Sequence, residues 1–178
     1  IRNGVVYDGG GSPPQRVDVA VRDGRIVELL HAGKAAHAGK EIDAGGKAVA
    51  PGFINVLSWA TESLIVDGRG VSDTKQGVTL EIFGEGWSMG PVNERMKADA
   101  LKQQADIRYD IPWTTLGGYL EHLQQRGVTP NVASFIGTAT VRIHELGEDD
   151  VKPTPEQLSR MQDVVRQAMR EGALGVGS

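Results

Sequence analysis

The stretch PGFINVLSWATE, residues 51–62, marks the point at which the pattern of this sequence changes, and it decides the predicted fold. Before it, short alternating apolar runs are separated by Gly-rich turns, a pattern that is typical of strands and hairpins. The dipeptide Asp23-Gly24 carries the clearest hairpin signal among these turns. Residues 1–50 are therefore predicted to form a small β-sandwich segment.

After Pro51, strand-like runs alternate with helical ones. The predicted strands cover residues 53–57, 78–83, 130–137 and 173–178. The predicted helices cover residues 72–76, 93–105, 114–125 and 155–171, and the last of them begins with a capping box, Thr154 to Gln157. Strict alternation predicts parallel βα units. A barrel of such units needs eight strands and typically about 250 residues, so we expect the chain to be the N-terminal part of a longer protein; an open four-stranded sheet is the alternative.

Composition narrows the class of protein. The 178 residues are 39% hydrophobic, with a formal net charge of -4, which is typical of a soluble globular protein and disfavours a nucleic-acid-binding surface. The chain contains no Cys, so it has neither disulfides nor thiolate metal ligands. No apolar run approaches the roughly 18 residues of a membrane span. The first residues read as a strand already under way, so both a cytoplasmic protein and one exported after loss of a leader are consistent with the sequence.

Four segments, taken in order, resemble a known family. They are VAPGFIN, QGVTLEIFGEG, NVASFIGTATVR and MREGALGVGS, which begin at residues 49, 76, 131 and 169. Their order and spacing resemble the N-acyl-D-amino-acid deacylase (D-aminoacylase) branch of the amidohydrolase superfamily. The resemblance implies a metal-dependent (β/α)8 barrel that hydrolyses the amide of an N-acyl-D-amino acid or a similar compound. Residues 51–178 would then be the first four βα units, partnered by the other half of the barrel.

The sequence departs from that family at its first metal-binding motif. The family has His-x-His at the end of the first barrel strand, where a repeat of two residues places both rings on one side. Here Leu57 and Trp59 occupy those positions, and neither is an ordinary metal ligand. Thr138 stands where the family often has another His. The sequence thus predicts that one metal position is lost.

Glu85 is the candidate metal ligand that remains. The family has Gly-Asn-Cys-Gly at the end of the second strand, with Cys as a ligand, and Glu85 matches either the Asn or the Cys of this shorter loop. Alternation within the strand predicts that Glu81 and Glu85 face the barrel interior, whereas the opposite, apolar set faces the helices: Val78, Leu80 and Ile82. The resemblance implies one divalent ion, zinc in the first instance. The alternative is a carboxylate held by backbone N–H groups of the Gly-rich turn.

Arg142 and Trp87 are the candidate substrate-binding residues. A guanidinium near the barrel mouth can bind a substrate carboxylate through two hydrogen bonds, but Arg142 can equally form an ion pair with the acidic segment at residues 147–150. Trp87 can line a pocket or serve only as packing. The four His residues are each interpreted as solvated: His31, His37, His122 and His144. Ser58 and Ser88 lack the neighbours of a serine nucleophile.

Two functions therefore remain. In the first, a deacylase-type hydrolase acts on a small amide, and a metal-bound water attacks the amide carbon. Its catalytic residues are expected in the half of the barrel that these residues do not supply. In the second, a member of the same family has lost catalysis and keeps the barrel for binding or for structure. The absence of the His pair favours the second function, and the carboxylate of Glu85 favours the first.

Overall fold

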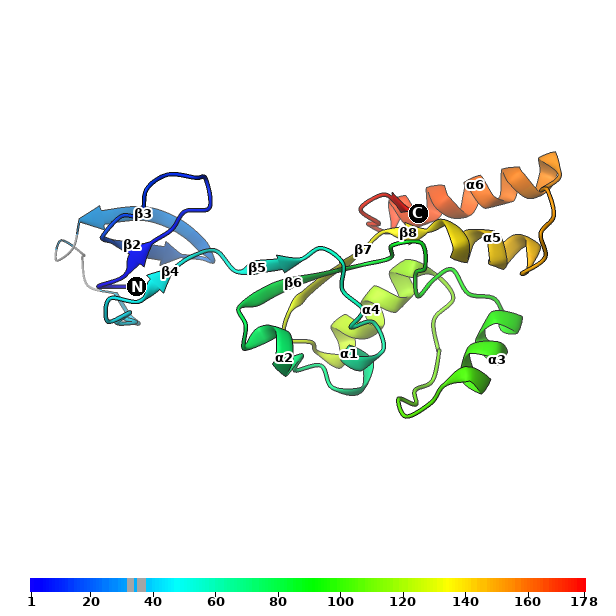
Figure 1. Ribbon diagram of the computed structural model, residues 1–178, viewed down its shortest axis with the longest axis horizontal. Coiled ribbons are helices and arrows are strands. Elements are labelled where there is room, and N and C mark those ends of the chain that lie inside the picture. The colour runs from blue at the N-terminus through cyan, green and yellow to red at the C-terminus, as the bar shows by residue number, and fades with distance from the viewer. Residues whose placement is uncertain (32–33, 35–37) are drawn as a thin grey trace. The chain divides into compact units, whose positions relative to one another are not determined.

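The computed structural model describes residues 1–31, 34 and 38–178, and His37 lies outside these residues. The chain divides into two compact units, Ile1–Gly52 and Phe53–Ser178 (Figure 1). This division lies next to the boundary that the sequence places before residue 51. Among the described residues, no helix has the length and apolar character that crossing a membrane requires.

The described residues of the first unit form two two-stranded sheets. Strands β2 (Val17–Arg22) and β3 (Arg25–His31) form an antiparallel hairpin, and β1 (Val5–Val6) pairs in parallel with β4 (Ala48–Val49). The hairpin turn has positive φ at both central residues, 50° at Asp23 and 73° at Gly24. That backbone is the one that a two-residue hairpin turn requires, so the Asp-Gly signal of the sequence is confirmed.

The second unit is built on parallel strands. Strands β5 (Phe53–Asn55), β6 (Val78–Phe83) and β7 (Asn131–Ser134) form a three-stranded parallel sheet in that order. Strand β8 (Ile136–Gly137) pairs in parallel with β9 (Val176–Gly177). The predicted parallel βα units are therefore confirmed.

The strand predicted at residues 130–137 is interrupted at Phe135. The N–H of Phe135 donates to the carbonyl of Phe83 at 2.9 Å, whereas the next N–H, of Ile136, donates to Gly175 at 2.9 Å. The chain thus changes its hydrogen-bonding partner from β6 to the segment that leads into β9. An apolar run in sequence cannot reveal this change, because both halves carry strand-forming residues.

Six helices connect the described strands, and their bounds are α1 (Ser63–Val66), α2 (Val71–Thr74), α3 (Glu94–Gln103), α4 (Leu116–Arg126), α5 (Thr138–Leu146) and α6 (Pro155–Arg170). The capping box of α6 is confirmed: Gln157 N–H donates to the Thr154 hydroxyl at 3.2 Å, and Thr154 N–H donates to the Gln157 side chain at 2.8 Å.

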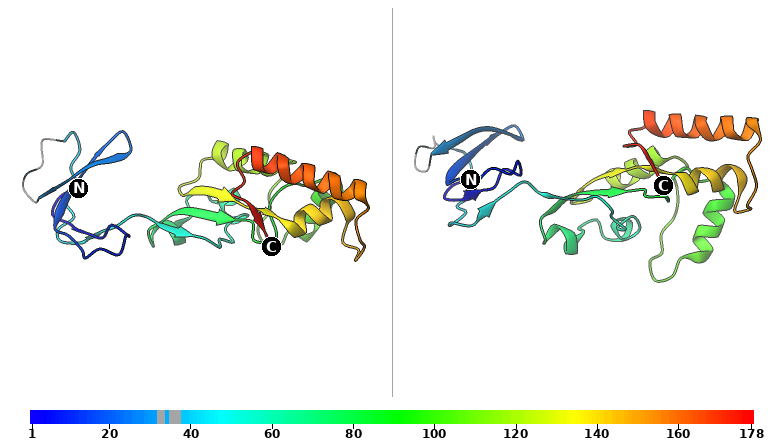
Figure 2. Two further views of the ribbon diagram at one scale, coloured as in Figure 1. Left: turned by 90° about the horizontal axis from the view of Figure 1, so that it is seen from above. Right: turned by 45° about the horizontal axis from the view of Figure 1, so that its top comes forward.

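The sequence pattern does not predict helix α5. The sequence favours an extended segment there, because β-branched residues are frequent and no side chain caps the first turn. Tertiary packing overrides that local preference. Helix α5 lies beside α6 (Figure 2), and Thr140 and Val141 on α5 are both buried. His144 lies within α5 and its Nδ1 atom is buried, which contradicts the interpretation of this His as solvated.

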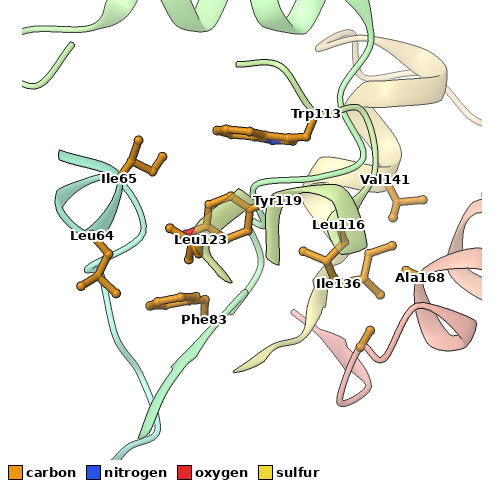
Figure 3. Packing of buried hydrophobic residues seen from close by; sticks show 11 residues of the cluster. Leu64, Ile65, Phe83, Trp113, Leu116, Tyr119, Leu123, Ile136, Val141 and Ala168 are labelled. Atoms are coloured by element: carbon orange, nitrogen blue, oxygen red, sulfur yellow. The ribbon is translucent and has the colours of Figure 1, made fainter. Parts of the chain in front are cut away.

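The core of this unit lies between β6 and α4 (Figure 3). The Phe83 ring is 6.4 Å from that of Tyr119, and the Tyr119 ring is 5.2 Å from that of Trp113, between centroids. Leu123 is fully buried in the same cluster. Because Phe83 and Glu81 share one face of β6, the helix-covered face is the one that carries them. The prediction that Glu81 faces away from the helices is wrong.

Candidate active site

The segment that follows β6, residues 84–89, lies where several strand ends meet. The Ala139 N–H donates to the carbonyl of Gly86 at 3.0 Å, so the start of α5 is hydrogen-bonded to this segment. Gly84 has φ of 95°, and a Cβ there would come within 2.8 Å of both the Phe135 carbonyl carbon and the Ser134 hydroxyl. Only glycine fits such a position, since both the backbone angle and the space exclude a side chain.

Ser88 fastens this segment to α5 through its backbone and its hydroxyl. The Ser88 N–H donates to the Thr140 hydroxyl at 2.8 Å, the Ser88 hydroxyl donates to Gly90 O at 2.6 Å, and the Gly137 N–H donates to the Ser88 hydroxyl at 3.0 Å. Its hydroxyl thus both donates and accepts a hydrogen bond within the fold. The role of Thr140 carries no sequence signal, because its partner is 52 residues away.

Glu85 is exposed at this strand end. A Cβ on Gly177 would lie 3.3 Å from the Cα of Glu85, which places the end of β9 directly beside it. The Glu85 carbonyl accepts from the Trp87 N–H at 2.7 Å. Within the described part of the chain, no hydrogen bond or ion pair involves the Glu85 carboxylate. The turn therefore does not hold the carboxylate through N–H groups, and its oxygens are available to a ligand.

Glu81 presents the opposite case. It is 1% exposed on the helix-covered face of β6, and in the described residues its Oε2 atom has no hydrogen-bond partner. A buried carboxylate oxygen without a partner costs stability. Glu81 and Glu85 therefore occupy different environments, although the two lie close together in the sequence.

Leu57 and Trp59 follow the end of β5 and are 47% and 77% exposed. Ser58 between them is buried, its N–H donates to Ile82 O at 2.9 Å, and its hydroxyl accepts from the Ala60 N–H at 3.1 Å. This anchors the turn to the end of β6. The two apolar side chains are thus exposed beside the end of the strand in the Phe53–Ser178 unit.

Arg142, a candidate substrate-binding residue, makes contacts close to it in the sequence. The Arg142 guanidinium, on α5, donates to the carbonyls of Asp149 and Val151 at 2.9 and 2.7 Å, so it closes the loop after its own helix. Asp149 belongs to the acidic segment at residues 147–150, but Arg142 binds its backbone carbonyl and, among the described residues, does not form the ion pair of the alternative interpretation.

The other candidate residues lie in separate places. The His122 ring packs against Trp113, with 5.1 Å between centroids. Trp87 is 60% exposed, and His31, at the end of β3, is exposed as well. Thr138 is the exposed first residue of α5.

The described residues offer few side chains that could bind a metal ion. Across residues 1–31, 34 and 38–178, no group of three or more His, Asp or Glu side chains comes together as an ion site. Zinc needs about four donors in a structural site and about three protein donors in a catalytic one. Glu85 supplies a single carboxylate, and the positions of Leu57 and Trp59 supply none. These residues by themselves do not fit a complete metal site.

The chain is similar to known deacylases in sequence and in structure. No family model matches the chain. N-acyl-D-aspartate deacylase of Alcaligenes xylosoxydans xylosoxydans is 30% identical over 184 residues, which cover 100% of this chain and 36% of that enzyme. A crystal structure of D-aminoacylase, which defines a novel subset of amidohydrolases, matches with a TM-score of 0.81 at 28% identity, over 99% of this chain and 37% of that one.

A third match is to an enzyme whose structure was determined with zinc bound. N-acyl-D-glutamate deacylase of Bordetella bronchiseptica, complexed with zinc and a phosphonate inhibitor, matches with a TM-score of 0.76 at 28% identity, over 98% of this chain and 36% of its own. The homologues and structural neighbours are thus amidohydrolase-type deacylases. The resemblance to D-aminoacylase and the N-acyl-D-amino-acid deacylases is confirmed over the whole chain. The chain spans about a third of the length of the curated relatives it matches, from 31% to 37%.

Proposed function

We propose that this chain forms part of a D-aminoacylase-type hydrolase that cleaves the amide bond of an N-acyl-D-amino acid. The observation that carries the proposal is the match to D-aminoacylase over 99% of the chain, with a TM-score of 0.81. The names of the related deacylases support the substrate class, because two of them act on N-acyl derivatives of acidic D-amino acids. Residues 53–178 would belong to a (β/α)8 barrel, which the parallel strands of this unit support.

Glu85 is proposed as the residue of this chain that binds a divalent ion. Its exposed carboxylate lies at a strand end, where barrel enzymes build their sites. Carboxylate oxygen is an accepted zinc ligand, and zinc is the ion named for the Bordetella enzyme. The other ligands would have to come from residues beyond this chain. Trp87 remains the better supported substrate-binding residue, because the Arg142 guanidinium already donates to two carbonyls.

A second function is favoured by one specific observation. On the family resemblance, Leu57 and Trp59 stand where a His pair is expected, and their side chains offer no atom that binds zinc. A protein of this family without catalysis, which binds a small amide or serves in structure, is consistent with that replacement. This second function predicts binding without turnover.

Measurements on the intact protein distinguish the hydrolase from the binding function. Its metal content is measured by elemental analysis, and its hydrolysis of N-acetyl-D-glutamate and N-acetyl-D-leucine is compared with that of the L enantiomers. The first function predicts bound metal and turnover of a D substrate. Glu85→Gln keeps the size of the side chain and removes its charge, so metal content should fall and turnover should drop by about a hundredfold or more.

The matched control is Glu121→Gln, at an exposed position of α4. It should change neither metal content nor turnover. Metal content and turnover that survive Glu85→Gln would show that Glu85 is not a ligand. An intact protein that lacks turnover on both substrates would favour the binding function.

A further inference from the structure

A cavity of about 230 Å³ lies beside the strand-end segment. Its walls come from α3, α5, the segment at residues 87–92 and the segment at residues 109–113. The largest apolar lining residues are Trp87, Met89, Met96, Tyr109, Ile111 and Trp113. None of the sequence motifs indicates this cavity, because its walls come together only through the packing of α3.

Hydrogen bonds and stacking hold one wall of the cavity in place. The rings of Tyr109 and Trp113 are stacked, with centroids 6.4 Å apart and planes inclined by 8°. The Trp113 indole N–H donates to Met89 O at 2.6 Å, and the Tyr109 hydroxyl donates to the Glu62 carboxylate at 2.7 Å. Burial and the Glu62 carboxylate raise the pKa of Tyr109 well above its ordinary value. A preformed wall lowers the entropic cost of binding.

The charged groups of the cavity disfavour an anion. Four charged residues line it, of which three are acidic and one is basic: Glu62, Asp99, Glu148 and Arg95. The only basic group already donates to Ile143 O at 2.9 Å. A substrate carboxylate would therefore meet net negative charge here, which is unfavourable. A neutral apolar group meets aromatic rings and thioethers, which are suited to bind it.

The size of the cavity fits one part of a substrate. An apolar cavity of about 150 Å³ is enough to bind benzene. Pockets that take a whole drug-sized ligand measure about 300–1,000 Å³. A volume of about 230 Å³ therefore suits a medium-length acyl chain or an aromatic acyl group.

The position of the cavity places such a group next to the strand end. Trp87 and Ser88 line the cavity, and the Trp87 N–H donates to the carbonyl of Glu85. A ligand whose apolar tail enters the cavity would thus carry its amide toward residues 85–88. The same placement leaves the carboxylate of the ligand outside the acidic cavity.

We propose that this cavity binds the apolar acyl group of an N-acyl amino acid. The assignment rests on the proposed function and deepens it, since it names the part of the substrate that these residues recognise. It predicts a preference for long over short acyl groups. Each methylene that enters an apolar cavity adds about fourfold to affinity.

The experiment uses two neutral amides, octanamide and acetamide, with the intact protein in a calorimetric titration. Octanamide should bind at least tenfold more tightly than acetamide. Ala100→Leu, on the cavity side of α3, fills part of the volume and should lower octanamide affinity at least tenfold. The matched control is Ala98→Leu, an exposed position of the same helix outside the cavity lining, which should leave affinity within twofold.

Enlarging the cavity gives a second test, in case Ala100→Leu fails to fold. Met96→Ala removes a lining side chain and should shift the preferred amide to a longer chain. Equal affinity for octanamide and acetamide would overturn the proposal, as would an octanamide affinity that neither cavity variant changes.

A kinetic comparison separates this proposal from the proposed function. The ratio of kcat/KM for N-octanoyl-D-leucine to that for N-acetyl-D-leucine should fall in Ala100→Leu. If Ala100→Leu turns over both substrates with an unchanged ratio of kcat/KM values, the proposed hydrolase function stands and the acyl site is overturned. Octanamide binding that depends on Ala100, without turnover of either substrate, would support the acyl site and contradict the hydrolase.

Discussion

The two faces of the β5–β6–β7 sheet are covered differently. On one face, Phe83 and Glu81 are 2% and 1% exposed beneath the helices. On the other face, Ile54 is 55% exposed, and Leu80 and Ile82 are only half-buried. The more apolar face of β6 is therefore the less covered one in the Phe53–Ser178 unit. Alternation in a sequence defines two faces of a strand, but it does not say which face the helices cover.

The aromatic residues of α4 and its neighbouring loop explain which face is covered. Tyr119 packs against both Phe83 and Trp113, and its hydroxyl donates to Thr61 O at 2.9 Å. Large rings bury the most apolar area and so dominate the packing. Glu81 is carried onto the same face because side chains repeat every two residues along a strand. Burial of this carboxylate is a cost that the aromatic packing offsets.

The largest expected effect tests the covered face. Leu123→Ala removes a fully buried side chain of α4, and we expect the free energy of unfolding to fall by about 2–5 kcal/mol. Leu101→Ala, at a position of α3 that is 46% exposed, is the control and should cost less than about 1 kcal/mol. Urea unfolding of the intact protein measures both. Similar losses in the two variants would contradict the assignment of the covered face.

A smaller effect of opposite sign tests the buried carboxylate on that face. Glu81→Met keeps an unbranched side chain and removes the oxygen that lacks a partner, so the free energy of unfolding should rise by about 1–3 kcal/mol at pH 7. Glu121→Met, at an exposed position of α4, should change it by less than about 0.5 kcal/mol. A destabilised Glu81→Met would mean that the carboxylate gains a partner in the intact protein.

The smallest effect concerns the open face. Ile54→Thr keeps a β-branched side chain at a position that is 55% exposed, so we expect a change within about 0.5 kcal/mol. The same substitution at Ile136, which is fully buried in β8, should cost about 2 kcal/mol or more, because it buries a hydroxyl and removes a methyl group. If the two losses are equal in the intact protein, other residues cover the face that carries Ile54.

For the candidate metal ligands, the sequence and the structure supply different information. The family resemblance implies a lost ligand pair at Leu57 and Trp59, and it leaves Glu85 either as a metal ligand or as a carboxylate held by backbone N–H groups. The structure adds that the carboxylate is exposed and makes no hydrogen bond within the described residues, and that Gly84 and Gly177 allow the strand ends beside it to approach closely. Those contacts join residues far apart in the chain, so no local pattern could reveal them.

Local signals in this sequence determined the elements whose causes are local. The Asp23-Gly24 turn, the Thr154 capping box and the alternation of strands with helices each depend on residues a few positions apart, and each occurs as predicted. Tertiary structure alone decided three other features: helix α5, the interruption at Phe135, and the covered face of β6. The physical reason is common to them. Each depends on which distant side chains bury the most apolar area together, and packing of this kind overrides local preference.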